Sequence, residues 1–234
     1  KGNYPKPSGA GEAARIFCEV IVKKAERVYN RFGVSDLRKV FARANSAVAK
    51  YNRSQGRVKG KLNYWDFDLF AATAAFVVVK DKQVYWASLC DSFAVCFDKT
   101  RRQKFKSPDC WLTLRQNLPK NWLAIPEDKR KKIIRRVYRN GTNRKGELIG
   151  YGVVTGEKAA ERYLNFGRFE VEKGDVVFVL TDGFENHMNL PQFIELFNKW
   201  PKDLNKKVQT FVARKSLNDP QTFGKEKTLI AIKF

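Results

Sequence analysis

Three apolar segments follow one another almost without a break, and the short gaps between them limit the folds open to the chain. Residues 71–79, 83–89 and 92–97 are apolar and rich in valine and aromatic residues, which favour β-strands. Only three and two residues separate the segments, whereas parallel neighbours need a crossover of about a dozen residues or more. The three segments therefore predict antiparallel strands.

Helical patterns surround this β region. Apolar residues three or four positions apart predict a helix over 11–32, and a second helix is expected to begin at Ser35, whose hydroxyl can cap free amide groups. The strands 168–172 and 175–180 are expected to form a hairpin at Lys173-Gly174. Further helices are predicted at 109–118, 127–139, 157–165, 190–199 and 203–216, and a last strand at 228–234. The order predicts an α+β domain of antiparallel sheets covered by helices.

Composition narrows the classes of protein. The 234 residues suit one large domain. Lys and Arg number 46 against 24 Asp and Glu, and the net charge of +22 implies acidic partners without specifying a fold. Four cysteines without a CxxC pair and a single histidine argue against a disulfide scaffold, a structural zinc site and a multi-histidine metal site. No apolar run approaches the roughly 20 residues of a membrane span, so we expect a monomeric cytoplasmic protein without membrane contact.

Two aspartates stand at the ends of predicted strands. Asp182 ends an apolar segment and precedes Gly183, which lets a ligand approach the backbone, and Asp91 lies between two strands. A carboxylate beside apolar strands is costly unless it is solvated, hydrogen bonded or bound to a metal. Two such carboxylates on neighbouring strands would suit Mg²⁺ or Mn²⁺, although spacing alone favours a simple Asx turn at Asp182.

Basic residues gather in three runs, at 57–61, 99–106 and 129–139. Such patches can bind nucleic acid through its phosphates. In the last run an apolar stripe also predicts a helix whose lysines and arginines are its solvated face. A basic margin for acidic phosphoprotein substrates explains the charge equally well, so nucleic acid stays an open alternative.

Several short motifs occur in an order that resembles the metal-dependent protein phosphatases of type 2C. The resemblance rests on Gly11-Glu-Ala-Ala-Arg15, Ala72-Thr73-Ala74, Cys90-Asp91-Ser92, Gly174-Asp175, Thr181-Asp182-Gly183 and, in part, Lys225 to Ile232. It spans nearly the whole chain. It implies one domain over 1–234 that lacks the family's N-terminal strands, with two antiparallel β-sheets sandwiched between helices.

The resemblance also implies an activity. Phosphatases of this type use two Mg²⁺ or Mn²⁺ ions to activate a water that attacks phosphoserine or phosphothreonine in a phosphorylated protein. The reacting group is then the metal-bound water, so no catalytic side chain is assigned. Carried over by position, Asp182 is a primary metal ligand, Gly183 is also a residue of the metal site, and Asp91 helps to hold an additional, weaker ion.

Two departures from the family pattern bear on that metal site. The family's early Asp-Gly has no counterpart from Lys1 onward, so it is expected upstream or absent. Lys225 stands where the family has its last ligand aspartate, and an ammonium group cannot ligate a cation. Glu226 could replace that ligand only if a loop or bulge re-aims it. Lys225 could instead pair with Asp182 or hold a phosphate oxygen.

Two functions follow. The first is a metal-dependent phosphoserine/phosphothreonine phosphatase. The alternative is a catalytically impaired phosphatase-like domain that binds or regulates. In either case Lys225, with Arg139 and Arg144 of the loop 139–152, is a candidate contact for the substrate phosphate.

Two smaller expectations concern the single histidine and two of the cysteines. His187 could orient substrate or water, although a surface histidine near a helix start is the commoner case. Cys90 and Cys96 are expected to be small core residues rather than redox groups.

Overall fold

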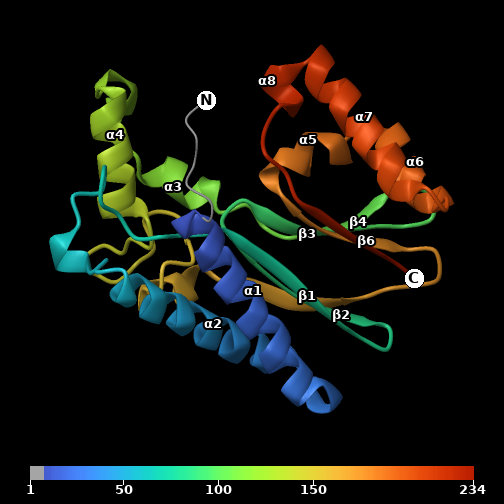
Figure 1. Ribbon diagram of the computed structural model, residues 1–234, viewed down its shortest axis with the longest axis horizontal. Helices are drawn as coiled ribbons and strands as arrows, with labels where there is room; N and C mark the ends of the chain where they lie inside the picture. Colours follow the sequence, from blue (N-terminus) through green and yellow to red (C-terminus); the bar gives the residue numbers. More distant parts are fainter. Residues whose placement is uncertain (1–7) are drawn as a thin grey trace.

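Two antiparallel sheets pack against each other, and helices cover both outer faces (Figure 1). The computed structural model describes residues 8–234, so the first seven residues of the expected domain 1–234 lie outside the described residues. The first sheet has the order β1-β2-β5, with β1 (Ala74–Lys80), β2 (Gln83–Leu89) and β5 (Asn165–Glu170). The second has the order β4-β3-β6-β7, with β3 (Ser92–Phe97), β4 (Gln103–Lys106), β6 (Val176–Thr181) and β7 (Leu229–Lys233). The expected α+β arrangement is confirmed.

Two long helices, α1 (Gly9–Val28) and α2 (Val34–Ser54), cover the first sheet. Their apolar faces carry the periodicity seen in the sequence, and Phe17 and Phe41 meet edge to face with ring centroids 5.7 Å apart. The predicted start of α2 at Ser35 is wrong by one residue. The helix begins at Val34, and the Gly33 amide donates to the Asp36 carboxylate at 3.1 Å. The acidic side chain therefore supplies the cap that the hydroxyl was expected to provide.

A second layer of helices covers the other sheet. It contains α5 (Glu185–Met188), α6 (Pro191–Lys199), α7 (Leu204–Asn218) and α8 (Pro220–Phe223). Phe193, Ile194 and Phe197 of α6 are fully buried and pack with Phe178 of β6 in one hydrophobic cluster. This aromatic core fixes α6 on the sheet that carries Asp182 at the end of β6.

A smaller apolar layer lies between the sheets. Val84, Cys96, Val171 and Val177 are buried there together. Cys96 is thus the small core residue that the sequence predicts, and Cys90 is buried as well.

The chain crosses between the sheets three times, and the last of these crossings, from β5 to β6, corrects a prediction. The expected hairpin of 168–172 with 175–180 is wrong, because β5 pairs with β2 while β6 pairs with β3 and β7. The connection turns at Gly174, which has a φ of 95°. The first crossing is the two-residue turn Cys90-Asp91 between β2 and β3, and the second is the long connection from β4 to β5. Short connections predict antiparallel strands, but they do not say which sheet each strand enters.

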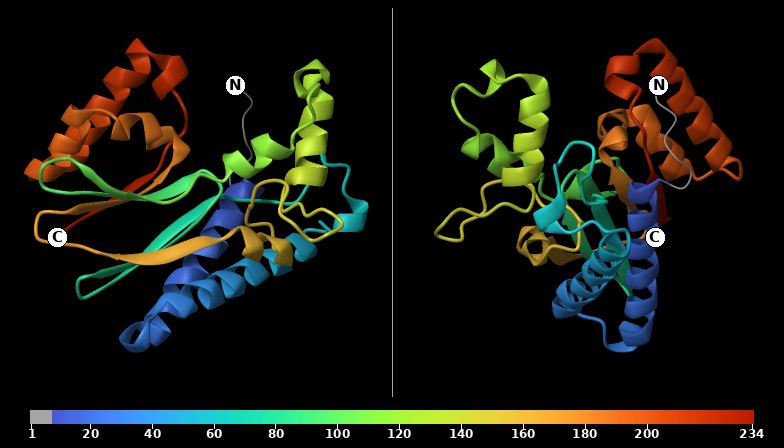
Figure 2. Two further views of the ribbon diagram at one scale, coloured as in Figure 1. Left: turned by 180° about the vertical axis from the view of Figure 1, so that it is seen from behind. Right: turned by 60° about the vertical axis from the view of Figure 1, so that its left-hand side comes forward.

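A separate group of helices stands at one end of the sheets, away from α6 and α7 (Figures 1 and 2). It consists of α3 (Trp111–Asn117) and α4 (Glu127–Ile133), the latter continued by a π-helical turn over Ile134–Tyr138. The loop 139–152 follows, as predicted, and the expected helix at 157–165 is a 3₁₀ segment, Lys158–Tyr163. Within residues 8–234, no helix has the length and apolar content needed to cross a bilayer.

Candidate functional site

The two strand-end aspartates come together at one edge of the second sheet. Strands β3 and β6 are antiparallel neighbours, and Ser92 is paired with Thr181 in their register. Asp91 precedes the first of these residues and Asp182 follows the second, so both carboxylates lie just beyond the same end of the ladder. The convergence expected from the sequence is thus present in the fold.

The electrostatics of Asp91 reflect this closeness. Burial raises the pKa of Asp91 above its usual value, and the negative charge of Asp182 raises it further. Lys225 acts in the opposite direction. Two carboxylates held this near each other attract a cation, and the chain itself contains a cationic side chain at this edge.

Lys225 provides it. Its Nζ donates a hydrogen bond to Oδ2 of Asp182 at 2.7 Å, and this bond raises the pKa of Lys225. Both side chains are partly exposed. The pairing that the sequence offered as one outcome for Lys225 is therefore the arrangement in the structure.

Gly183 is required by a close approach of the chain. A Cβ atom at this position would lie 2.3 Å from the carbonyl oxygen of Glu226, so any side chain would force the segment before β7 away. Glu226 reaches the site through its backbone, and the residue as a whole is exposed. The close contact explains why a glycine follows Asp182.

The donor set does not fit a pair of divalent ions. Within residues 8–234, no three histidine, cysteine, aspartate or glutamate side chains lie close enough to hold a metal. Asp91 and Asp182 are accompanied by an ammonium group, which supplies no lone pair and repels a cation. The described residues therefore do not form the metal centre that the resemblance implies.

Arg139 is engaged elsewhere. Its two terminal nitrogens donate to the two oxygens of Asp68, both at 2.8 Å, and its side chain is only 5% exposed. Asp68 lies 71 residues earlier in the chain, so no local sequence pattern points to this pair. A phosphate bound by Arg139 would have to displace that carboxylate. Arg144 is exposed in the loop.

His187 is a core residue rather than the surface histidine expected from its place near a helix start. The side chain is fully buried and is surrounded by the rings of Phe184, Phe193 and Phe223. Burial lowers the pKa of His187 to about 4, so the ring is neutral at pH 7. The helix start that carries it is covered by α6 and α8, which sequence periodicity does not reveal.

No protein-family model matches the sequence, and no curated protein matches it. Solved structures do. They include serine/threonine phosphatases, one of them described as a PPM phosphatase, and the chain has their fold.

Three of these structures show how far the likeness extends. The catalytic domain of the phosphatase PstP, solved with two manganese ions, is 11% identical, with a TM-score of 0.54 over 93% of this chain and 79% of that one. MsPP from Mycobacterium smegmatis, solved with cacodylate, is 12% identical, with a TM-score of 0.54 over 96% and 82%. PppA from Pseudomonas aeruginosa is 11% identical, with a TM-score of 0.54 over 96% and 80%. At such identities the likeness establishes the fold.

Proposed function

We propose that the chain is a phosphatase-like domain that binds phosphorylated proteins without metal-dependent turnover. The observation that carries this proposal is the 2.7 Å ion pair between Lys225 and Asp182. An ammonium group at that distance occupies the carboxylate that a divalent ion would need. The chain's own lysine then offsets part of the negative charge of the edge formed by Asp91 and Asp182.

The same lysine supplies a contact for phosphate. An exposed ion pair of this kind contributes at most about 1 kcal/mol, so Lys225 can exchange Asp182 for a phosphate oxygen at little cost. A charge-assisted bond from the ammonium group to phosphate would replace the one that is lost. Arg144, exposed in the loop 139–152, is a second proposed contact.

A metal-dependent phosphoserine/phosphothreonine phosphatase is the second candidate. The fold of the solved phosphatases and the side-by-side placement of Asp91 and Asp182 favour it. It requires that Mg²⁺ or Mn²⁺ displace Lys225 from Asp182. It also requires an added acidic donor, for which the Glu226 carboxylate is a candidate beside Gly183.

One set of variants separates the two candidates. Hydrolysis of para-nitrophenyl phosphate is measured with added Mn²⁺, and Mn²⁺ binding is measured by calorimetry, for the wild type, Lys225→Asp and Asp182→Ala. We expect the wild type to show neither turnover nor a heat of Mn²⁺ binding, and Lys225→Asp to gain Mn²⁺ binding because it replaces a repelling charge with a ligand. Mn²⁺-dependent hydrolysis by the wild type that Asp182→Ala abolishes would establish the second candidate instead.

The binding function is tested separately. A phosphoserine peptide is expected to bind the wild type more tightly than its unphosphorylated form, and Lys225→Ala is expected to remove the difference. Equal affinity for both peptides in the wild type would contradict the proposal. Lys202→Ala, an exposed lysine between α6 and α7, is the matched control.

A further inference from the structure

The fold brings two of the basic runs to one place. Lys59 and Tyr64 of the segment after α2, together with Lys132 and Arg136 of α4 and its π-helical turn, line a cavity of about 470 Å³. These residues are more than 60 positions apart in the sequence. Neither run alone indicates that they share a surface.

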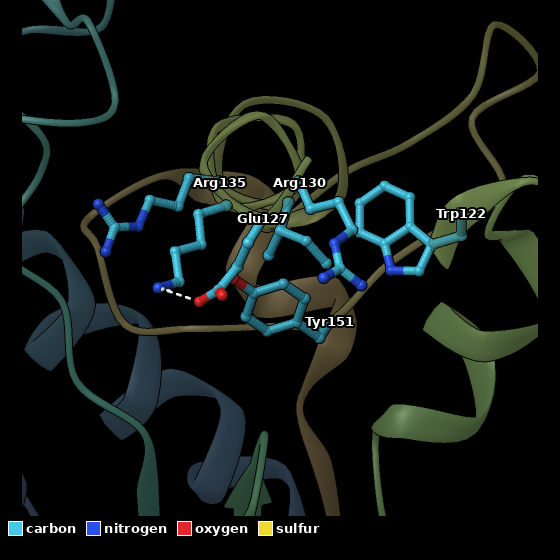
Figure 3. Close-up of a pocket in the computed structure, with 7 residues that line it drawn as sticks. Trp122, Glu127, Arg130, Arg135 and Tyr151 are labelled. Atoms are coloured by element: carbon cyan, nitrogen blue, oxygen red, sulfur yellow. Dashed lines mark ion pairs between the residues drawn. The ribbon is translucent and has the colours of Figure 1, made fainter. Parts of the chain in front are cut away.

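A second cavity, of about 280 Å³, lies on the other side of α4. Trp122 and Tyr151 form its aromatic walls, and Arg130 and Arg135 supply its charge. Figure 3 shows Arg130 directed toward both rings, with Glu127 paired to a neighbouring lysine below the helix. The two cavities and the helix between them are named here the α4 groove.

Most of the charge in the α4 groove is not balanced from within the protein. Lys131 pairs with Glu127 at 2.6 Å, and Arg135 lies 3.8 Å from Asp68. The other basic residues of the segment form no ion pair with a carboxylate among residues 8–234; they are Lys129, Arg130, Lys132 and Arg136. Lys59, at the margin, pairs with Glu157. This surface therefore keeps an excess of positive charge for an external anion.

Aromatic side chains interrupt that charge. Trp65 is 43% exposed, and Nζ of Lys132 lies 6.0 Å from its ring centroid. Tyr151 is held flat by stacking on Trp111, with ring centroids 5.3 Å apart and an interplanar angle of 18°. Rings presented between cationic groups are the arrangement on which unpaired bases stack while their phosphates are neutralised. The carboxylate side chains of an acidic peptide cannot stack on the rings, and a duplex does not expose its bases to them.

We propose that the α4 groove binds single-stranded nucleic acid. Lys132 and Arg136 contact the phosphates on one side of the helix, and Trp122 and Trp65 provide faces for the bases. This function is independent of the site formed by Asp91, Asp182 and Lys225, because none of the side chains of the α4 groove belongs to that site.

Fluorescence anisotropy with a labelled 20-nucleotide single strand tests the proposal on the full chain. With three or four phosphates neutralised, the logarithm of the association constant should fall with the logarithm of salt concentration with a slope of about −2 to −3. Lys132→Glu combined with Arg136→Glu should weaken binding at least about tenfold at low salt. Trp65→Ala or Trp122→Ala should weaken it roughly five- to a hundredfold through lost stacking.

Three controls make the result decisive. Lys202→Glu combined with Lys206→Glu makes the same change in net charge on exposed residues outside the groove, and it should leave most of the affinity intact. A duplex and a polyglutamate of equal charge should bind more weakly than the single strand. The proposal is overturned if the groove variant binds like the wild type, if the control variant loses as much, or if duplex or polyglutamate binds as tightly. Thermal melting of each variant verifies that it is folded, and Trp65, being exposed, gives a stacking test that does not disturb the core.

Discussion

The segments 99–106 and 129–136 carry similar positive charge, yet the fold uses them in opposite ways. In the first, which contains β4, carboxylates from other parts of the chain meet the basic residues; Lys104 pairs with Asp175 at 2.7 Å and Lys106 with Glu185 at 2.6 Å. In the second, which contains α4, most basic residues have no carboxylate partner among residues 8–234. A basic segment is therefore structural or available to a partner according to the carboxylates that the tertiary fold places opposite it.

The depth of those carboxylates sets the energy involved. The Asp175 side chain is only 3% exposed and also accepts a bond from the Glu172 amide at 2.9 Å. A carboxylate buried in this way needs its counter-charge. The lysines of α4 do not pair with a buried carboxylate. Removing a basic side chain should therefore lower stability more in β4 than in α4.

The largest effect is expected for Lys104→Met, which leaves the buried Asp175 carboxylate without its cation. We expect the free energy of unfolding to fall by about 3 kcal/mol, measured by denaturant titration. Lys106→Met is the matched control in the same strand, because its partner Glu185 is partly exposed, and it should cost less than about 1 kcal/mol. Equal losses in the two variants would contradict the role given to burial.

The second-largest loss of stability is expected for Arg139→Met. It removes the bidentate partner of Asp68 but leaves Arg135 nearby at 3.8 Å. We expect a loss of about 2 kcal/mol in the free energy of unfolding. Asp68→Asn in the same background should recover part of that loss, because it removes the unpaired charge. No recovery would show that Arg139 acts through packing alone.

His187 extends the comparison to a buried group with no carboxylate beside it among the described residues. Its pKa is lowered by burial to about 4, against about 6.5 in an unfolded chain. The unfolded state therefore binds the proton first, and the free energy of unfolding should decline as pH falls from about 6.5 toward 4, by roughly 1–3 kcal/mol. Because His187 is the only histidine, His187→Leu should flatten the upper part of that pH profile, and an unchanged profile would contradict the assignment.

The smallest effect is expected for Lys132→Ala. The residue is exposed and its ammonium group has no carboxylate partner among the described residues. The free energy of unfolding should change by less than about 0.5 kcal/mol, while affinity for a single strand should decline. A large loss of stability would show that Lys132 stabilises the fold as the lysines of β4 do, and it would contradict the difference drawn between the two segments.

The elements that sequence periodicity predicts well are those that lie in one environment along their whole length. The boundaries of β2 and β3 are confirmed as predicted, because each is mostly apolar, buried along almost its whole length and bounded by a turn. Strand β4 is not predicted by the sequence, because its lysines resemble a solvent-exposed basic segment. Their partners, Asp175 and Glu185, are distant in the sequence and become neighbours only in the fold. The hairpin of β5 and β6 was wrong because pairing between distant strands prevailed over the short connection.

The candidate site divides in the same way. That Asp91 and Asp182 would converge could be inferred, since the resemblance supplied the order of the strands. The pairing of Lys225 with Asp182 could be named as one option but not chosen over others. The bond from Arg139 to Asp68 could not be predicted, because the two residues are 71 positions apart and no local sequence pattern links them.

The chain passes from one sheet to the other at both ends, through Cys90-Asp91 and through the connection after β5. Near the first passage the hydroxyl of Thr73, just before β1, lies 2.9 Å from that of Ser92 in β3, and this hydrogen bond joins the two layers. Neither layer can slide over the other at this point without breaking that bond. The molecule should accordingly lose both layers in one cooperative step, so that labels on α2 and α7 keep a constant separation until the whole domain melts.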